Sequence, residues 1–349
     1  MVNLIHVITP APRDTWVEVL NSDAEALITQ TPDWLTCIRR AGAYTDASRL
    51  YLFDDGRRIV LPFARRQHRP PVLATEGSWP FDWGIGGPLV DGPVDTGHTR
   101  GVYADLLSHP ALARTLRTGP CADPAWRTAP PVFHRTKHTT QIVDLAGGFE
   151  TVWSTRFRSS VRRAIRKAER ANLHVEVDRT GRLIPVFYDL YQQSIQRWAA
   201  QQHEPLPLAR WRAHRANPLR KFHTVADQLG DRCAVWVAWQ AGEPVAALIV
   251  LRHLGQAKYW RGAMNSELAS PTRANDLLHR LAIEDACQAG CSRYHMGDSR
   301  PGSGLAAFKA GFGAQPYLSH TYRAERIPLS AMDHQLRALA KRALRFRDA

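Results

Sequence analysis

The chain has 349 residues, with 46 Lys and Arg against 32 Asp and Glu, which gives a formal net charge of +14. A hydrophobic share of 44% and a charged share of 22% are those of a folded globular protein, and the length favours two domains. The longest apolar run, 244–251, is far too short for a membrane helix, and no signal-peptide pattern is seen, so we expect a cytoplasmic protein. The excess positive charge predicts a polyanionic partner.

The first half of the sequence predicts alternating strands and helices. Residues 49–66 form two strands around an Asp-Asp-Gly turn, which is typical hairpin chemistry. A strand over 84–90 and a helix over 101–116 follow. A further strand is expected over 139–145, after a Pro-rich loop.

The second half repeats this order of elements. A helix over 155–172 precedes a hairpin over 234–252 with a Gly-Glu-Pro turn. The next expected elements are a strand over 256–264, a helix over 273–290 and a strand over 291–297. Because the two halves share the order of their elements, we expect two tandem copies of one α/β unit, each a mixed central sheet flanked by helices.

The predicted domain boundary lies near residue 150, where a glycine-containing stretch separates a strand from the basic helix. The expected domains are therefore 1–150 and 151–325. The segment 326–349 has an apolar stripe among several cations, which predicts a basic amphipathic helix that packs on the body.

The helix over 155–172 is strongly basic. Its apolar side chains recur at helical spacing and should face the core, so the cations point to solvent. One acidic residue, Glu169, cannot neutralise them, whereas a phosphodiester backbone would. The alternative is a solvated face with no ligand. The cations expected to bind phosphates are Arg156, Arg158, Arg162, Arg163, Arg166 and Lys167.

Residues 294–316 combine a strand end, a glycine-rich loop and a short helix that carries Lys309. Lysine can give up a proton or place a compact charge against a developing oxyanion, whereas arginine keeps its proton. Only six of the basic residues are lysines, so we take Lys309 as a candidate catalytic cation; the alternative is an exposed cation on a surface turn. Asp298, at the end of the strand, is a candidate proton acceptor or amine anchor, or else caps a turn.

A metal site is not expected. Cys287, Cys291 and His295 have suggestive spacing, but Gly290 ends a helix between them, so one face cannot present all three. The five cysteines are odd in number and scattered, which disfavours a disulfide scaffold. No nucleophile elbow, P-loop or dinucleotide fingerprint is present.

Several blocks of the second half resemble the Fem family of non-ribosomal aminoacyltransferases, within the FemAB-like acetyltransferase-like proteins. The resemblance covers about 150–315, and the first half agrees more loosely. It is carried by the basic helix, YWRGAMN (259–265), RANDLLHRLAIEDACQAG (273–290), YHMGDS (294–299) and FKAGFG (308–313).

The resemblance implies two tandem GNAT-like domains, the first on the acceptor side and the second on the donor side. It also implies an aminoacyl-tRNA donor, a small-molecule or peptide amine acceptor and no bound cofactor. Phe308 and Lys309 fall on the pair that holds the aminoacylated tRNA end. Two such halves in one chain require no dimer, so we expect a monomer.

Two other functions remain open at this stage. The broader family permits an acyl-CoA donor, for which acetyl-CoA is the obvious probe. In that case, the loop at Ser270–Thr272 and the helix start at Arg273 and Asn275 would bind the donor, although the loop lacks the usual glycines. The third is a non-catalytic RNA-binding module that uses only the basic surface.

Overall fold

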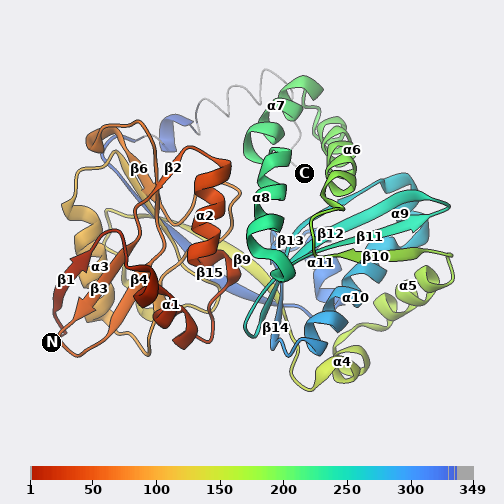
Figure 1. The fold of residues 1–349 in the computed structure, drawn as a ribbon, viewed down its shortest axis with the longest axis horizontal. Helices are drawn as coiled ribbons and strands as arrows, with labels where there is room; N and C mark the ends of the chain where they lie inside the picture. The colour runs from red at the N-terminus through yellow and green to blue at the C-terminus, as the bar shows by residue number, and fades with distance from the viewer. Residues whose placement is uncertain (1, 329, 334, 336–349) are drawn as a thin grey trace. The chain divides into compact units, whose positions relative to one another are not determined.

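The computed structural model describes residues 2–328, 330–333 and 335, so most of the helix expected over 326–349 lies outside the described residues. The chain forms two compact units (Figure 1). Unit 1 comprises the chain up to Thr140 with Asp298–Pro301 and Pro316–Pro328, and unit 2 comprises Gln141–Gly297 and Gly302–Gln315. The sequence placed the boundary at residue 150, whereas the contacts divide the units within a strand, at Thr140 and Gln141. The acceptor and donor roles of the two halves stay a prediction.

Unit 1 contains strands of two sheets and three α-helices in its described part. One sheet is antiparallel, in the order β1-β3-β4-β7, and the other has the order β15-β8-β6-β5-β2 with a parallel β6–β8 pair. Its elements are β1 (Leu4–Ile8), α1 (Arg13–Ser22), α2 (Pro32–Ala41), β2 (Tyr44–Asp46), β3 (Arg49–Phe53), β4 (Arg58–Leu61), β5 (Ala64–Arg66), β6 (Thr75–Gly77), β7 (Leu89–Val90), α3 (Thr96–Ser108), β8 (Ala113–Arg117), β9 (His134–Asp144) and β15 (Gln315–Glu325), the last two shared with unit 2.

The first hairpin is confirmed, since β3 pairs with β4 around a turn in which Gly56 has a φ of +83°. The helix expected over 101–116 is wrong at its end. Helix α3 stops at Ser108, and the following residues form strand β8. Because a residue that precedes proline avoids the helical backbone, Pro110 ends the helix there.

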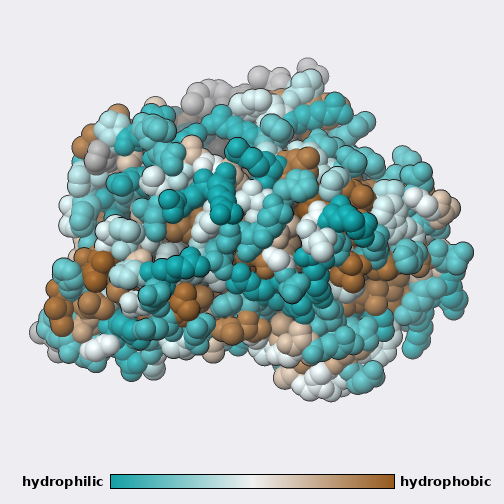
Figure 2. All heavy atoms as spheres, viewed as in Figure 1, coloured by the Kyte–Doolittle hydropathy of each residue, from teal (hydrophilic) through white to brown (hydrophobic). Residues whose placement is uncertain are grey.

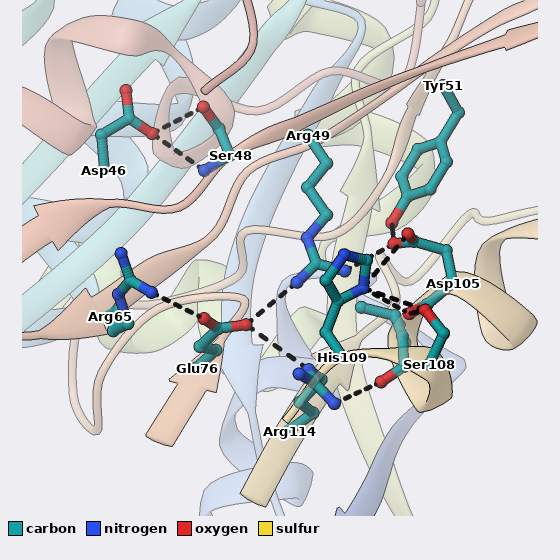
Figure 3. A network of polar contacts seen from close by, with 11 residues as sticks. Asp46, Ser48, Arg49, Tyr51, Arg65, Glu76, Asp105, Ser108, His109 and Arg114 are labelled. Atoms are coloured by element: carbon teal, nitrogen blue, oxygen red, sulfur yellow. Dashed lines mark hydrogen bonds and ion pairs between the residues drawn. The ribbon is translucent and has the colours of Figure 1, made fainter. Parts of the chain in front are cut away.

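A buried ionic network joins the strands and helix α3 of unit 1 (Figure 3). The Arg49 guanidinium lies 2.5 Å from the Asp105 carboxylate and 3.0 Å from that of Glu76, and all three side chains are buried. Tyr51 donates a hydrogen bond of 2.9 Å to Asp105. Burial raises the pKa of the Tyr51 phenol well above its usual value, so this donor keeps its proton at neutral pH.

Unit 2 is built around one mixed sheet in the order β10-β11-β12-β13-β14, antiparallel except for the β13–β14 pair. Its elements are α4 (Gly148–Thr151), a π-helical turn (Val152–Arg156), α5 (Ser159–Glu169), β10 (His174–Asp178), α6 (Ile184–Gln202), α7 (Leu206–Ala216), α8 (Leu219–Leu229), β11 (Cys233–Gln240), β12 (Glu243–His253), β13 (Gln256–Met264), α9 (Ser266–Thr272), α10 (Ala274–Gln288), β14 (Arg293–Asp298) and α11 (Gly304–Gly311). The fold class is thus the expected one, two α/β units with mixed sheets flanked by helices.

The core of unit 2 lies between this sheet and helices α5 and α10. The basic helix is not continuous over 155–172, because Phe157 has an extended backbone and α5 begins after it. Phe157, Ile165 and Ala168 face the core, as their spacing predicted. Within the described part of the chain, every helix is too short or too polar to cross a lipid bilayer.

Loss of the Asp105 carboxylate should destabilise unit 1 strongly. We expect Asp105→Ala to lower the free energy of unfolding by about 3–5 kcal/mol, because Arg49 would keep a buried charge with one partner fewer. The exposed pair Arg13–Asp33, at 2.8 Å, is the matched control, and Arg13→Ala should cost less than about 1 kcal/mol. Urea denaturation measures both, and equal costs would contradict a structural role for the network.

Candidate functional site

The parallel strands β13 and β14 part before they end. Their paired positions run from Gln256–Arg293 to Lys258–His295, while β13 continues to Met264 and β14 to Asp298. At the open end, side chains form the hydrogen bonds to the strand backbone that a neighbouring strand would otherwise form. Ser194 of α6 accepts a hydrogen bond from the Met264 N–H, and Arg197 donates one of 3.0 Å to the Met264 carbonyl. The opening is therefore formed without leaving these backbone groups unpaired.

Lys309 lies at this opening. Ser303 caps the N-terminus of α11 by accepting from the Ala306 N–H, and the helix then turns Lys309 inward. Its side chain is only 3% exposed, and Nζ donates to the Gly297 carbonyl at 2.9 Å. The alternative of an exposed surface cation is therefore excluded. The ammonium is held at the end of β14, where the strands have separated.

A wall of rings stands beside Lys309. The buried His279 of α10 has its ring centre 4.8 Å from that of Tyr259 and 5.6 Å from that of Phe308. Its Nδ1 lies 3.3 Å from the Tyr294 hydroxyl oxygen. Burial, and secondarily the charge of Lys309, lower the pKa of His279 to about 3, so the imidazole is neutral. We call Tyr259, His279, Tyr294 and Phe308 the ring wall.

Tyr259 is fixed by a close approach to the backbone of its own strand. A Cβ atom at Gly262 would come within 2.2 Å of the Tyr259 hydroxyl oxygen, so glycine alone leaves room for the phenol. Burial raises the pKa of Tyr259 to about 12, and the phenol therefore keeps its proton at neutral pH. Sequence reasoning missed Tyr259, His279 and Tyr294, although all three lie in the blocks that resemble the Fem family.

Asp298 belongs to unit 1, where its carboxylate is already engaged. One oxygen accepts from Thr140 at 2.6 Å, and the other forms an ion pair of 2.5 Å with Arg117. His138 Nδ1 lies 3.9 Å from the same carboxylate, and burial lowers the pKa of this histidine. A carboxylate held by a cation and a hydroxyl is a weak proton acceptor, which argues against Asp298 as the general base, and its role as an amine anchor stays a prediction.

The expected phosphate-binding cations fall into two groups. Arg156 donates to the carbonyls of Asp144 and Ala146, and Arg162 donates to three carbonyls at the end of the π-helical turn, so both cap the backbone. The others are exposed, and the described residues form no ion pair with them. We call Arg158, Arg163, Arg166, Lys167 and Arg170 the basic face.

The basic face is attached to the helix that carries Lys309. The Arg158 N–H at the start of α5 donates to the Gly311 carbonyl at 2.8 Å. A Cβ at Gly311 would come within 2.6 Å of the Val161 side chain, so the two helices are in close contact there. The exposed cations of α5 thus begin at a hydrogen bond to α11, the helix that carries Lys309.

The expected donor loop is instead helix α9, which contains Pro271, and α10 follows after Arg273 with a φ of +59°. Asn275 contacts the Met264 sulfur at 2.7 Å. The buried Asp276 occupies the first turn of α10, and burial raises its pKa. A carboxylate at this position competes with an anionic ligand for the helix N-terminus. Within the described residues, no three His, Cys, Asp or Glu side chains could hold a metal ion together.

Comparison with known proteins places this geometry in a family. Residues 155–312 match the family model described as an acetyltransferase (GNAT) domain. The second half of the chain is a GNAT-type domain. This match supports an acyltransferase-type domain over these residues. No curated protein sequence matches the chain.

Solved structures extend the likeness to nearly the whole chain. FemX superposes with a TM-score of 0.62 at 13% identity, covering 92% of this chain and 97% of its own. A conserved protein of unknown function from Bacteroides thetaiotaomicron gives 0.56 at 13%, covering 93% and 100%. The C-terminal domain of a putative lysylphosphatidylglycerol synthetase from Agrobacterium fabrum gives 0.52 at 14%, covering 92% and 96%. The Fem-like GNAT fold inferred from the sequence is thereby confirmed.

Replacement of His279 should change how stability depends on pH. Because the folded pKa is about 3 and the ordinary value is 6.5, the unfolded chain binds a proton that the folded state excludes, and stability falls as pH drops through this window. We expect the profile of His279→Phe to be shallower by about 1.4 kcal/mol per pH unit between about pH 5.5 and 3.5. Denaturant unfolding across this range measures the difference. Parallel profiles for the two proteins would mean that His279 is not held neutral.

Proposed function

We propose that the protein transfers an aminoacyl group from aminoacyl-tRNA to an amine, forming an amide bond in natural-product or peptidoglycan-type biosynthesis. The observation that carries the proposal is the buried Lys309 ammonium at the open end of β14, on a helix that is hydrogen-bonded to the basic face of α5. The GNAT-type domain supports acyl transfer, and the Fem-like fold supports an aminoacyl group as the one transferred.

The residues at the site suit this reaction. The amine nitrogen attacks the ester carbonyl, a C–N bond forms and the C–O bond to the ribose breaks. The amine loses a proton, and the departing ribose oxygen gains one. Negative charge develops on the carbonyl oxygen in between, where a buried ammonium such as that of Lys309 stabilises it more than in water. Because the ester is already activated, placement and charge stabilisation suffice and no covalent enzyme intermediate is needed.

An acyl-CoA donor is the second candidate, and the match to an acetyltransferase family model favours it. The N-terminus of α10 argues against it. There, α9 precedes α10 in place of the expected loop, and Asp276 in the first turn of α10 would oppose an anionic pyrophosphate at this N-terminus. We therefore prefer the aminoacyl-tRNA donor, with a small-molecule or peptide amine as acceptor. Since that donor is cytoplasmic, we expect the protein to act in the cytoplasm, as a monomer and without a bound cofactor.

The direct test is transfer by the purified protein from bulk aminoacyl-tRNA or acetyl-CoA to a pool of amines. We expect the parent protein to remove the amino acid from the tRNA. We expect Lys309→Ala to lower kcat by about 10²- to 10³-fold, because one oxyanion-stabilising charge is removed. Lys167→Ala, on the exposed basic face, is the matched control and should raise KM for tRNA with little change in kcat. Turnover of acetyl-CoA with indifference to aminoacyl-tRNA would replace this proposal by the second candidate.

The basic face should bind phosphates without reading sequence. We expect the triple variant Arg163→Ala, Arg166→Ala and Lys167→Ala to bind every tRNA more weakly by a similar factor. Its plot of log affinity against log salt should be shallower by roughly 2 to 3, because three counterion-releasing contacts are lost.

The control for the basic face is Arg162→Ala. Arg162 has the same charge on the same helix, but it caps carbonyls, so its loss should lower stability and leave the salt slope nearly unchanged. Filter binding at several salt concentrations measures these slopes. An unchanged slope for the triple variant would contradict phosphate binding by this face.

A further inference from the structure

A second surface of unit 2 combines exposed tryptophans with arginines. Trp198, on α6, is 40% exposed, and Trp211, on α7, is 58% exposed. Each has a guanidinium over its ring: Arg197 lies 5.8 Å from the ring centre of Trp198, and Arg215 lies 5.4 Å from that of Trp211. We call these four residues the Trp–Arg face.

The charged side chains of helix α7 itself all have one sign. Helix α7 contains no acidic residue, and Arg210, His214 and Arg215 all face solvent on it. Arg212, the remaining cation of the helix, is paired with Glu204 at 2.7 Å. A polyanion therefore complements α7, and exposed indole rings add a capacity to stack on flat groups.

The same helix is a poor membrane anchor. On its outer side, Leu208 and Trp211 are the exposed large apolar side chains, and cations lie between and around them. An interfacial helix needs a continuous apolar face to enter the lipid, which α7 lacks. Hydrophilic side chains also predominate on the face of the molecule shown in Figure 2.

The Trp–Arg face is physically joined to the candidate site. The guanidinium of Arg197 that stacks on Trp198 also donates to the Met264 carbonyl, at the end of β13. Helix α7, which carries Trp211, packs against α6, which carries Trp198. A ligand that stacks on Trp198 would thus rest on the residue that shapes one edge of the opening between β13 and β14.

From this arrangement we infer that the Trp–Arg face is a stacking platform for unpaired nucleotides of an RNA. The inference deepens the proposed function, on which its link to transfer rests, by assigning a second RNA contact separate from the basic face of α5. The basic face takes phosphates, and the Trp–Arg face takes bases. Together they would hold an RNA that has both a paired and an unpaired part.

The test uses the full chain and two RNA hairpins that carry no amino acid. Both have the same stem, but one is blunt and the other has a single-stranded 3′ extension. At one salt concentration, we expect Trp198→Ala and Trp211→Ala each to weaken binding of the extended hairpin by roughly 5- to 150-fold. Binding of the blunt hairpin should stay nearly constant. Trp211→Phe keeps a ring and should restore most of the affinity.

The matched control is Leu208→Ala, an exposed apolar residue of the same helix that cannot stack. It should leave both affinities nearly unchanged. Equal losses for Leu208→Ala and Trp211→Ala would overturn base stacking. If Trp198→Ala and Trp211→Ala lost binding to phosphatidylglycerol vesicles but kept RNA binding, the face would be a lipid-binding one and the inference would be overturned as well.

The outcomes also separate this inference from the proposed function. If the extended hairpin binds through the two tryptophans but no amino acid is ever transferred, the platform stands and the proposed function fails. If transfer from aminoacyl-tRNA proceeds with the same KM in Trp198→Ala and Trp211→Ala as in the parent protein, the proposed function stands and the platform fails.

Discussion

The parting of β13 and β14 is the constraint on which the rest of unit 2 depends. Two parallel strands that stop pairing would leave polar backbone groups buried, and that cost has to be met by other groups. Here α6 supplies Ser194 and Arg197 to Met264, and α11 supplies Lys309 to Gly297. The helices are thus held at the places where the sheet opens. The side chains that stabilise the opening are, for the same reason, those that a substrate between the strands would meet.

The excess positive charge can be interpreted only when the cations are sorted by the groups that each one contacts. In unit 1, Arg49 forms a buried ion pair with Asp105, and Arg114 forms one with Glu76. In unit 2, Arg156 and Arg162 cap carbonyls around the π-helical turn. Among the exposed cations, two groups lie on α5 and α7, which are helices of the GNAT-type half. Net charge alone indicated a polyanion, whereas its distribution indicates which surfaces could bind one.

Local patterning was enough to predict much of this fold. The strand expected over 256–264 is β13 itself, because its aromatic pair Tyr259 and Trp260 stands in a short run bounded by turn residues. The predicted end of the helix over 101–116 was wrong, because the apolar spacing of its last residues also suits a strand and Pro110 ends the helix before them. Helix α9 was missed because Pro271 and its neighbours have turn composition. The roles of Arg162 and His279 depend on which elements pack together, and no pattern within one element contains that information.

The neutrality of His279 also bears on how Lys309 can act. Two cations buried side by side repel each other strongly where the effective dielectric constant is low. Burial, and secondarily the charge of Lys309, lower the pKa of His279, so the imidazole of the ring wall is neutral. The ring wall therefore adds no second cation beside Lys309. The single buried ammonium of Lys309, fixed by the Gly297 carbonyl, suits a reaction in which one negative charge develops on one carbonyl oxygen.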